Sequence, residues 1–225
     1  MRSLQRIPCV WIFLSVLVKE NRMKRFIFLS VLIAMAVFFA DIGPAQDLTS
    51  LKEAFRKIRS VKAEFLQKRS LPILTKPLFS EGRLFFSMPD SLRWEYLSPL
   101  RSVMLRKGNN IQIYNFSDGV WKPELAQAVE SRRMVLAEIS HWFQGRFDES
   151  TAFRPSYSPG PPGRVLLVSR EGINKFINRI EIILSLRPGV IDRVEIEEPG
   201  GSRTSIEFKN VEINLSLPSE VFEKP

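Results

Sequence analysis

The sequence is nearly free of cysteine and histidine. Of its 225 residues one is a cysteine, Cys9, and one is a histidine, His141. His141 falls in a predicted helix and has no candidate catalytic partner nearby in the sequence, so we assign it no role. The sequence also lacks a glycine-rich phosphate loop. Nothing in it suggests a catalytic site, and we predict that the protein is not an enzyme and uses no metal ion and no cofactor.

Runs of like charge are also missing. The chain has 33 Lys and Arg residues against 24 Asp and Glu residues, a net charge of +9. The basic residues do not gather in one run, and the aromatic residues alternate with aliphatic ones instead of interleaving with Lys and Arg. These features argue against a nucleic-acid platform, and we predict no nucleic-acid partner.

The first 45 residues have the pattern of an export signal. Met23 opens a short basic segment, which is followed by the apolar run from Phe26 to Ala40. Gly43 and Ala45 are small residues at the two positions that a signal peptidase reads. We therefore predict a signal region over 1–45, with translation starting at Met23, cleavage after Ala45 and export to the periplasm.

Residues 46–225 are then expected to form a single domain. Removing six basic and two acidic residues from the totals leaves a net charge of about +5 and no cysteine, and the remaining length suits one domain with a substantial core. An earlier apolar run, 10–18, is too short to span a bilayer. The alternative is that the N-terminal region is a retained signal anchor.

Residues 81–116 alternate as expected for an antiparallel meander of four strands. Turns are predicted at Met88-Pro89-Asp90, at Ser98-Pro99 and at 107–110. One face is predicted to be polar, with Arg93, Glu95 and Met104 on it. The other is predicted to be apolar and to consist of Leu84, Phe86, Met88, Leu92, Trp94, Tyr96, Val103, Leu105, Ile111 and Ile113. Protein or ligand must cover this apolar face.

Two helices and several more strands surround the meander. An amphipathic helix is predicted from about residue 50 to Ile58, followed by a strand over 61–68. A second helix is predicted over 124–144, with Gly145 ending it. The loop 70–76 holds Leu71, Ile73 and Leu74, which suggests that it folds over something apolar or is simply packed.

The second half of the chain is predicted to be all strand. After a Pro- and Gly-rich loop, 156–163, the alternation predicts strands over 164–170, 174–186, 190–198 and 203–214. The total is nine to eleven strands with two helices. An antiparallel sheet of this length is expected to curl or close.

From Leu48 to Phe222 the sequence resembles the LolA family of periplasmic lipoprotein carriers. The resemblance lies in the order and spacing of short motifs: 61–67 (VKAEFLQ), 82–86 (GRLFF) with Pro89, 92–96 (LRWEY) with Pro99, Gly108, and 113–115 (IYN). No single motif is specific for the family, but the order and spacing of the motifs together are fairly specific.

The resemblance implies an α+β, mainly β fold, in which an unclosed antiparallel β-barrel and a helical lid enclose a hydrophobic cavity for acyl chains. The implied partners are acylated lipoproteins or other lipids, an inner-membrane lipoprotein-releasing transporter and an outer-membrane acceptor, and the carrier is expected to be a monomer. The residues expected to line the cavity are Phe55, Phe65, Leu84, Phe86, Met88, Leu92, Trp94, Tyr96, Val103, Leu105, Ile111 and Ile113. Those expected in the lid are Leu51, Phe55, Val135, Leu136, Ile139 and Phe143.

Met88 departs from the family pattern. Carriers of this family typically have an arginine before the proline that matches Pro89, and that arginine holds the lid by hydrogen bonds. A thioether cannot donate such a bond. Either packing alone holds the lid, or the cargo is another amphiphile such as a glycolipid. A different alternative is a lipid-sensing or interaction module, since periplasmic regulators use a similar domain followed by a second one.

Overall fold

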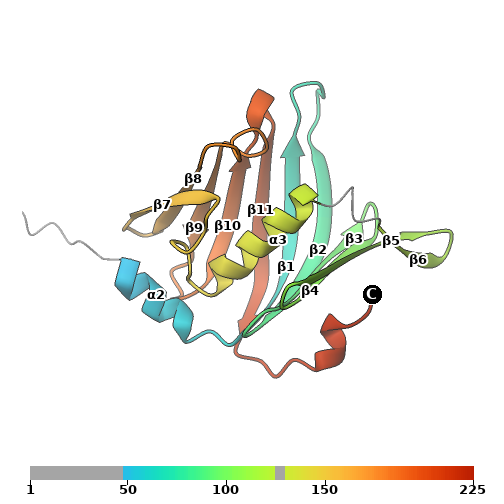
Figure 1. Ribbon diagram of the computed structural model, residues 1–225, viewed down its shortest axis with the longest axis horizontal. Helices are drawn as coiled ribbons and strands as arrows, with labels where there is room; N and C mark the ends of the chain where they lie inside the picture. The colour runs from blue at the N-terminus through green and yellow to red at the C-terminus, as the bar shows by residue number, and fades with distance from the viewer. Residues whose placement is uncertain (1–47, 125–129) are drawn as a thin grey trace, which may run out of the picture. The chain divides into compact units, whose positions relative to one another are not determined.

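The computed structural model describes residues 48–124 and 130–225, and these are built on one antiparallel sheet (Figure 1). The eleven strands of this part of the chain are ordered β6-β5-β4-β3-β2-β1-β11-β10-β9-β8-β7. The strands are β1 (Ser60–Ser70), β2 (Leu78–Ser87), β3 (Ser91–Ser98), β4 (Ser102–Lys107), β5 (Asn110–Ser117), β6 (Val120–Pro123), β7 (Phe153–Ser158), β8 (Arg164–Ser169), β9 (Arg179–Leu184), β10 (Ile191–Glu197) and β11 (Arg203–Ile213). The helices are α2 (Leu48–Arg56), α3 (Glu130–Phe143) and the short 3-10 turns η2 (Pro199–Gly201) and η3 (Ser219–Phe222). The mainly β, unclosed sheet with two α-helices that the sequence predicted is confirmed.

The sheet is joined at its centre by strands that lie far apart in the sequence. β1 pairs with β2 on one side and with β11 on the other, so that Phe65 lies opposite both Gly82 and Phe208. A Cβ atom at Gly82 would come within 2.3 Å of the Phe65 ring and 2.1 Å of the Glu95 carbonyl oxygen. Glycine is therefore required at position 82 so that the Phe65 ring can lie flat across β2.

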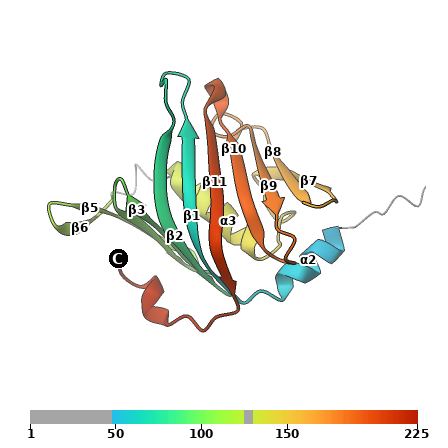
Figure 2. The same ribbon diagram turned by 180° about the vertical axis from the view of Figure 1, so that it is seen from behind.

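Both helices pack on the inner face of the sheet. Helix α3 crosses this face on the near side in Figure 1 and lies behind the strands in Figure 2, while α2 lies at one end of β9 and β10. Phe143 of α3 stacks on Phe86 with ring centroids 5.7 Å apart. Gly145, at φ +68°, follows the end of α3 as predicted, and the Gly145 N–H donates to the Trp142 carbonyl.

Several boundaries differ from the predictions. The predicted loop 156–163 overlaps β7, because Pro155 hid the weak alternation of that strand. The predicted strand 174–186 is only Arg179–Leu184, with turns over 171–176. Helix α2 begins two residues earlier than expected. Residues 125–129 of the predicted second helix, with Leu125 and Val129, lie outside the described residues, as does the predicted signal region 1–45.

The prediction that Val103 and Leu105 lie on the inner face is wrong. In the observed register Met104 lies opposite Trp94 and Ile113, whereas Val103 lies opposite Glu95 and Leu105 opposite Arg93. Facing residues of paired strands share a face, so Met104 points inward with Trp94. The sequence VML has no alternation of its own, and the turn after β3 shifts the register by one residue.

The C-terminal segment explains why the outward residues Val103 and Leu105 are still buried. Turn η3 lies against the outer face of β3 and β4, and its Phe222 is buried there. Arg93 donates from Nη1 to the carbonyl oxygens of Val221 (3.1 Å) and Lys224 (2.7 Å). Part of the outer face is thus covered by the chain's own end.

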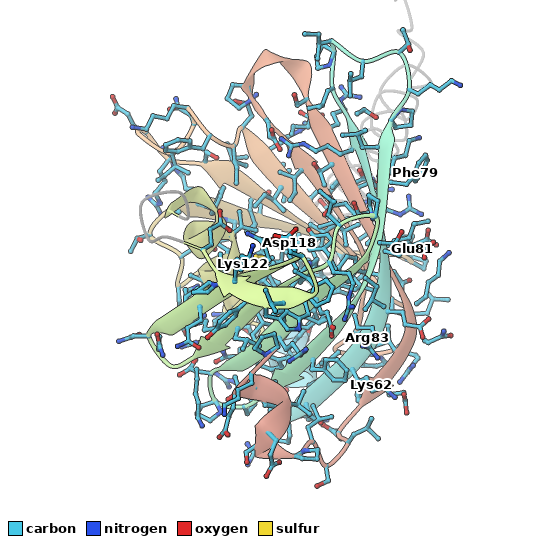
Figure 3. The ribbon with its side chains drawn as sticks, turned by 90° about the vertical axis from the view of Figure 1, so that its right-hand side faces the viewer. Lys62, Phe79, Glu81, Arg83, Asp118 and Lys122 are labelled. Atoms are coloured by element: carbon cyan, nitrogen blue, oxygen red, sulfur yellow. The ribbon has the colours of Figure 1, made fainter. Side chains whose placement is uncertain are left out.

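The outer face of β1 and β2 is polar for most of its length. Lys62, Glu81 and Arg83 point away from the sheet along these strands, with Phe79 near their far end (Figure 3). Two strands, β6 and β7, form the edges of the sheet, and each contains a proline, Pro123 and Pro155. No helix within residues 48–124 and 130–225 combines the length and apolar character needed to cross a membrane.

Candidate functional site

A cavity of about 400 Å³ lies between the inner face of the sheet and helix α3. Strands β1, β3, β4, β10 and β11 form its floor, α3 covers it, and the turn before β9 closes one side. The residues lining it are Gln67, Arg69, Trp94, Tyr96, Ser102, Met104, Val135, Ile139, Phe176, Ile177, Ile196, Glu198, Thr204 and Ile206.

The inner part of this cavity is apolar. Trp94, Ile139 and Ile206 are almost completely shielded from solvent and belong to the main hydrophobic core. Trp94 is held against Phe65, with ring centroids 4.4 Å apart, and meets Phe208 edge-on at 6.1 Å. Because these rings are fixed by their neighbours, the aromatic wall of the cavity is rigid.

The mouth of the cavity is polar. Arg69 at the end of β1 donates from Nη2 to both carboxylate oxygens of Glu198, at 2.8 and 3.2 Å. The Tyr96 hydroxyl donates to Gln67 Oε1 at 2.8 Å. An apolar interior behind a polar, charge-paired mouth suits a ligand with an apolar tail and a polar head.

Of the twelve residues predicted to line the cavity, Trp94 and Tyr96 do so. Most of the others form packed core under the helices or lie elsewhere. The core residues among them are Phe55, Phe65, Leu84, Phe86, Leu92 and Ile113, with Met88 and Ile111 packed at its margin, while Val103 and Leu105 lie on the outer face. The two helices therefore fill more of the inner face than the sequence indicated.

The predicted lid residues divide between two places. Val135 and Ile139 of α3 line the cavity, and Phe143 packs on Phe86 beyond it. Phe55 of α2, with Leu51 one turn before it, lies at the other end of the sheet, where the Phe55 ring meets Phe147 edge-on at 5.3 Å. The side chain of Leu136 lies outside the described residues. Of the two described α-helices, α3 is the one that covers the cavity.

Met88 lies in a separate hollow of about 320 Å³ with a cationic lining. Its N–H donates to the Arg59 carbonyl oxygen at 2.8 Å. The charged residues of this hollow are Lys52, Arg56, Arg59, Arg146 and Glu149.

A different arginine reaches the covering helix. Arg106 of β4 donates from Nη1 to the Ala137 carbonyl oxygen of α3 at 3.4 Å and from Nε to the Gly108 carbonyl oxygen at 2.9 Å. Packing is therefore not all that holds α3, although a hydrogen bond of 3.4 Å is a weak one.

Two ionisable groups on α3 have shifted pKa values. Burial raises the pKa of Glu138, and the hydrogen bond that it accepts from Ser150 Oγ at 2.8 Å partly opposes the shift. The pKa of His141 is lowered, first by burial and then by the nearby cations Arg146 and Arg106. Neither group lines the 400 Å³ cavity, so these shifts concern stability and not ligand binding.

Sequence reasoning missed most of the mouth. The ion pair between Arg69 and Glu198 joins residues 129 positions apart, and no local pattern reports such a pair. The inner wall could have been found from the alternating pattern of β11. Thr204, Ile206 and Phe208 occupy every second position of that strand, and all three are buried. Among the described residues there is no group of three His, Cys, Asp or Glu residues that could hold a metal ion.

Comparisons with known proteins place the chain in a family. The family model described as "Outer membrane lipoprotein carrier protein LolA" matches residues 56–224. Curated outer-membrane lipoprotein carrier proteins are similar over part or most of their length. That of Psychromonas ingrahamii is 27% identical over 124 residues, which is 53% of this chain and 60% of the relative. That of Shewanella frigidimarina is 32% identical over 50% of this chain and 53% of the relative. That of Dechloromonas aromatica is 24% identical over 81% of this chain and 85% of the relative.

Among solved structures, a LolA superfamily protein from Nitrosomonas europaea has a TM-score of 0.46 at 12% identity, covering 79% of this chain and 97% of the other. The chain spans about three fifths of the length of the Psychromonas relative and about half of the length of the Shewanella relative. The family model, in contrast, covers about three quarters of this chain. This chain belongs to the LolA family.

Proposed function

We propose that this protein is a periplasmic carrier that binds the acyl chains of lipoproteins and ferries them from the inner to the outer membrane. The observation that carries the proposal is the cavity of about 400 Å³ between the sheet and α3, with Trp94, Ile139 and Ile206 in its wall. Ligand pockets typically measure about 300 to 1,000 Å³ and are mainly apolar with a few polar groups.

The physical need for such a carrier follows from the cost of exposing an acyl chain to water. A buried methylene contributes about 0.8 kcal/mol, so a chain of roughly fifteen methylenes costs on the order of 12 kcal/mol to expose. A cavity wall of aromatic and aliphatic side chains replaces the lost membrane contacts. Release then requires that the cavity hold the chain no more tightly than the acceptor does.

Helix α3 is the part that would move on loading. Val135 and Ile139 close the cavity, while Phe143 seals the adjoining inner face against Phe86. Outward movement of α3 would join that packed region to the cavity and give room for a larger cargo. The weak bond from Arg106 to Ala137 opposes this movement only slightly.

The proposed cycle needs a donor and an acceptor on either side of the periplasm. The family relationship favours an inner-membrane lipoprotein-releasing transporter as the donor and an outer-membrane acceptor, with the carrier acting as a monomer. Export would depend on the predicted signal region, 1–45.

A second candidate is a carrier of another amphiphile, such as a glycolipid. The observation that favours it is Met88, which stands in a cationic hollow where the family resemblance calls for an arginine. A lipid-sensing module would bind the same class of ligand. Native mass spectrometry of protein purified from the periplasm without detergent separates the lipoprotein carrier from the other two candidates, because the bound mass identifies the cargo as an acylated protein or as a free lipid.

A cavity-filling variant tests the site itself. Ile206→Trp places a large ring in the cavity and is expected to weaken binding of a fluorescent acylated peptide at least tenfold, equivalent to about 1.4 kcal/mol. Val168→Trp, at a position exposed on β8, is the matched control and should bind like the wild type. Equal binding by both variants would show that the acyl chain is held elsewhere.

A further inference from the structure

The hairpin between β1 and β2 ends in exposed apolar side chains. We call residues 71–79 the hairpin tip. Ile73 is 88% exposed, and Leu74, Leu78 and Phe79 are each between 42% and 53% exposed. The sequence suggested that this loop folds over something apolar or is packed, and in the structure Leu71 is partly buried while Ile73 and Leu74 are exposed. A cluster of exposed apolar residues of this kind marks an interaction surface.

The hairpin tip adjoins the mouth of the cavity. Arg69, which lines the mouth, is paired across the hairpin with Leu78. Phe176, also at the mouth, is 45% exposed, and Leu100 is exposed in the turn just before the lining residue Ser102. Figures 1 and 2 both show this hairpin projecting at the end of the sheet remote from α2.

Apolar groups are found on both faces of the hairpin. Leu78 lies on the inner face beside Arg69, while Phe79 lies on the outer face, beyond Glu81 and Arg83 (Figure 3). Ile73 and Leu74 lie in the turn between β1 and β2. A projection that is apolar on both faces is better suited to entering a lipid interface than to packing against one flat protein surface.

The charges near the tip are mainly positive. The segment 68–79 contains Lys68, Arg69 and Lys76 and no acidic residue. Arg69 is paired with Glu198 in the neighbouring turn, and Glu197 at the end of β10 is bound by Arg179 and Arg203, so Lys68 and Lys76 give the region near the tip its net positive charge. Lysine and arginine next to exposed apolar groups are attracted to anionic lipid headgroups.

We propose that the hairpin tip docks the mouth of the cavity onto the surface of an anionic lipid bilayer, with Ile73 and Leu74 entering the interface. An acyl chain could then pass between the bilayer and the cavity with little exposure to water. Only this consequence rests on the proposed carrier function; the docking does not depend on what the cavity holds.

The test measures binding of the purified protein to vesicles by flotation. Vesicles of equal parts phosphatidylglycerol and phosphatidylcholine are compared with vesicles of phosphatidylcholine alone. Wild-type protein should bind the anionic vesicles at least tenfold more strongly. The double variant Ile73→Ser, Leu74→Ser should bind them at least tenfold more weakly than wild type, and Lys76→Ala about fivefold more weakly, because one basic residue near an anionic surface contributes about that factor.

The chain offers matched controls at the other end of the sheet. Leu186 is 80% exposed in the turn between β9 and β10, and Lys57 is exposed just after α2. Leu186→Ser and Lys57→Ala should bind vesicles like the wild type. All substituted side chains are exposed, so the melting temperatures should stay within about 2 °C of wild type, which circular dichroism checks.

Three results would overturn the proposal: no binding to anionic vesicles, equal binding to both kinds of vesicle, or a double variant that binds like the wild type. Self-association of the wild type that the double variant loses, without vesicle binding, would assign the tip to a second copy of the chain instead. Binding of the fluorescent acylated peptide is measured in parallel, and the double variant should retain it. Failure of docking is thereby distinguished from failure of the cavity.

Discussion

The two ends of the inner face use the same kinds of side chain and yet differ in packing. Near α2, Phe55 meets Phe147 and Phe86 stacks on Phe143, leaving a solid core. At the far end Trp94 and Met104 are just as apolar, but among the described residues they are covered by α3 and the turn before β9, and a cavity remains. The comparison shows that alternation along the strands decides which residues face inward. The placement of the helices decides which of those residues line a cavity.

The largest expected effect comes from placing a carboxylate at either end. Leu92 is fully buried in packed core, so Leu92→Glu buries an unpaired charge and should cost at least about 4 kcal/mol, enough to unfold much of the protein. Ile206 is only 5% exposed, but it borders the cavity, and the longer glutamate side chain can extend into that volume instead of into packed side chains. Ile206→Glu should therefore cost less than Leu92→Glu, about 2 to 3 kcal/mol. Urea unfolding followed by circular dichroism measures both.

Binding of the acylated peptide completes that test. Ile206→Glu should remain folded and lose binding, because the charge would lie against the acyl chain. If both variants unfolded alike, the cavity would be part of the core. If Leu92→Glu folded normally, the end near α2 would be open as well.

Met88→Arg probes the hollow near α2. The family resemblance predicts that an arginine here would hold the lid, weaken cargo retention and speed transfer. The structure instead places Lys52, Arg56, Arg59 and Arg146 around the hollow that Met88 lines. Lys52 is paired with Asp148 and Arg146 with Glu149, but Arg56 and Arg59 add further positive charge, so we expect Met88→Arg to destabilise the domain by about 1 kcal/mol through like-charge repulsion. The loss should be larger at about 0.01 M than at about 1 M salt, where the screening length falls from about 30 to 3 Å.

Met88→Leu is the control for that substitution and should be nearly neutral at both salt concentrations. A higher melting temperature for Met88→Arg, together with faster transfer of the acylated peptide, would favour the family's arginine contact over repulsion.

Glu138→Gln should stabilise the protein in a pH-dependent way. Burial raises the pKa of Glu138, so the folded protein binds this proton more tightly than the unfolded chain does. The favourable contribution is complete below the unfolded pKa of about 4.3 and is lost as pH rises through the folded value. The glutamine variant should therefore match wild type near pH 4 and exceed it by about 1 kcal/mol near pH 8.

Thermal unfolding across this pH range provides the measurement. Ser150→Ala is a useful companion, because it removes the hydrogen bond that opposes the shift and should steepen the loss of wild-type stability with pH. A constant difference between Glu138→Gln and wild type at all pH values would mean that Glu138 titrates normally.

The smallest expected effect concerns Arg106 and the covering helix. Removing its weak bond to Ala137 by Arg106→Met should cost about 0.5 to 1 kcal/mol and speed amide exchange in α3 more than in α2. The pKa of His141 should rise toward its usual value, because one nearby cation is lost while burial remains. Exchange that increases equally in both helices would show that Arg106 stabilises the whole domain and not α3 in particular.

Much of the fold could be predicted because its turns carry their own signals. Proline or glycine marks the turns after β2, β3 and β4, and the alternation between these turns places Trp94 and Tyr96 inward. The register across the turn after β3 could not be predicted, since Val103, Met104 and Leu105 are all apolar. The observed register differs from the predicted one by one residue, so that Met104 faces the cavity while Val103 and Leu105 face outward.

The cavity was less predictable than the sheet, because a cavity is the volume that packing leaves unfilled. Trp94, Tyr96, Val135 and Ile139 were identified, since they lie on apolar faces of single elements. The Arg69 to Glu198 pair closes the mouth between strands at opposite ends of the sequence. Only the strand order brings those residues together, and the local sequence does not encode it.

The two edges of the unclosed sheet affect how strongly this protein tends to aggregate at high concentration. An open sheet exposes unpaired backbone groups at each edge, to which strands of other molecules can add in growing fibrils. Here each edge strand contains a basic residue followed by proline, Lys122 with Pro123 in β6 and Arg154 with Pro155 in β7. Proline removes an N–H donor from each edge, and the charged side chain beside it, paired with Asp118 in the case of Lys122, disfavours the close approach of another edge, so the sheet can stay open without polymerising.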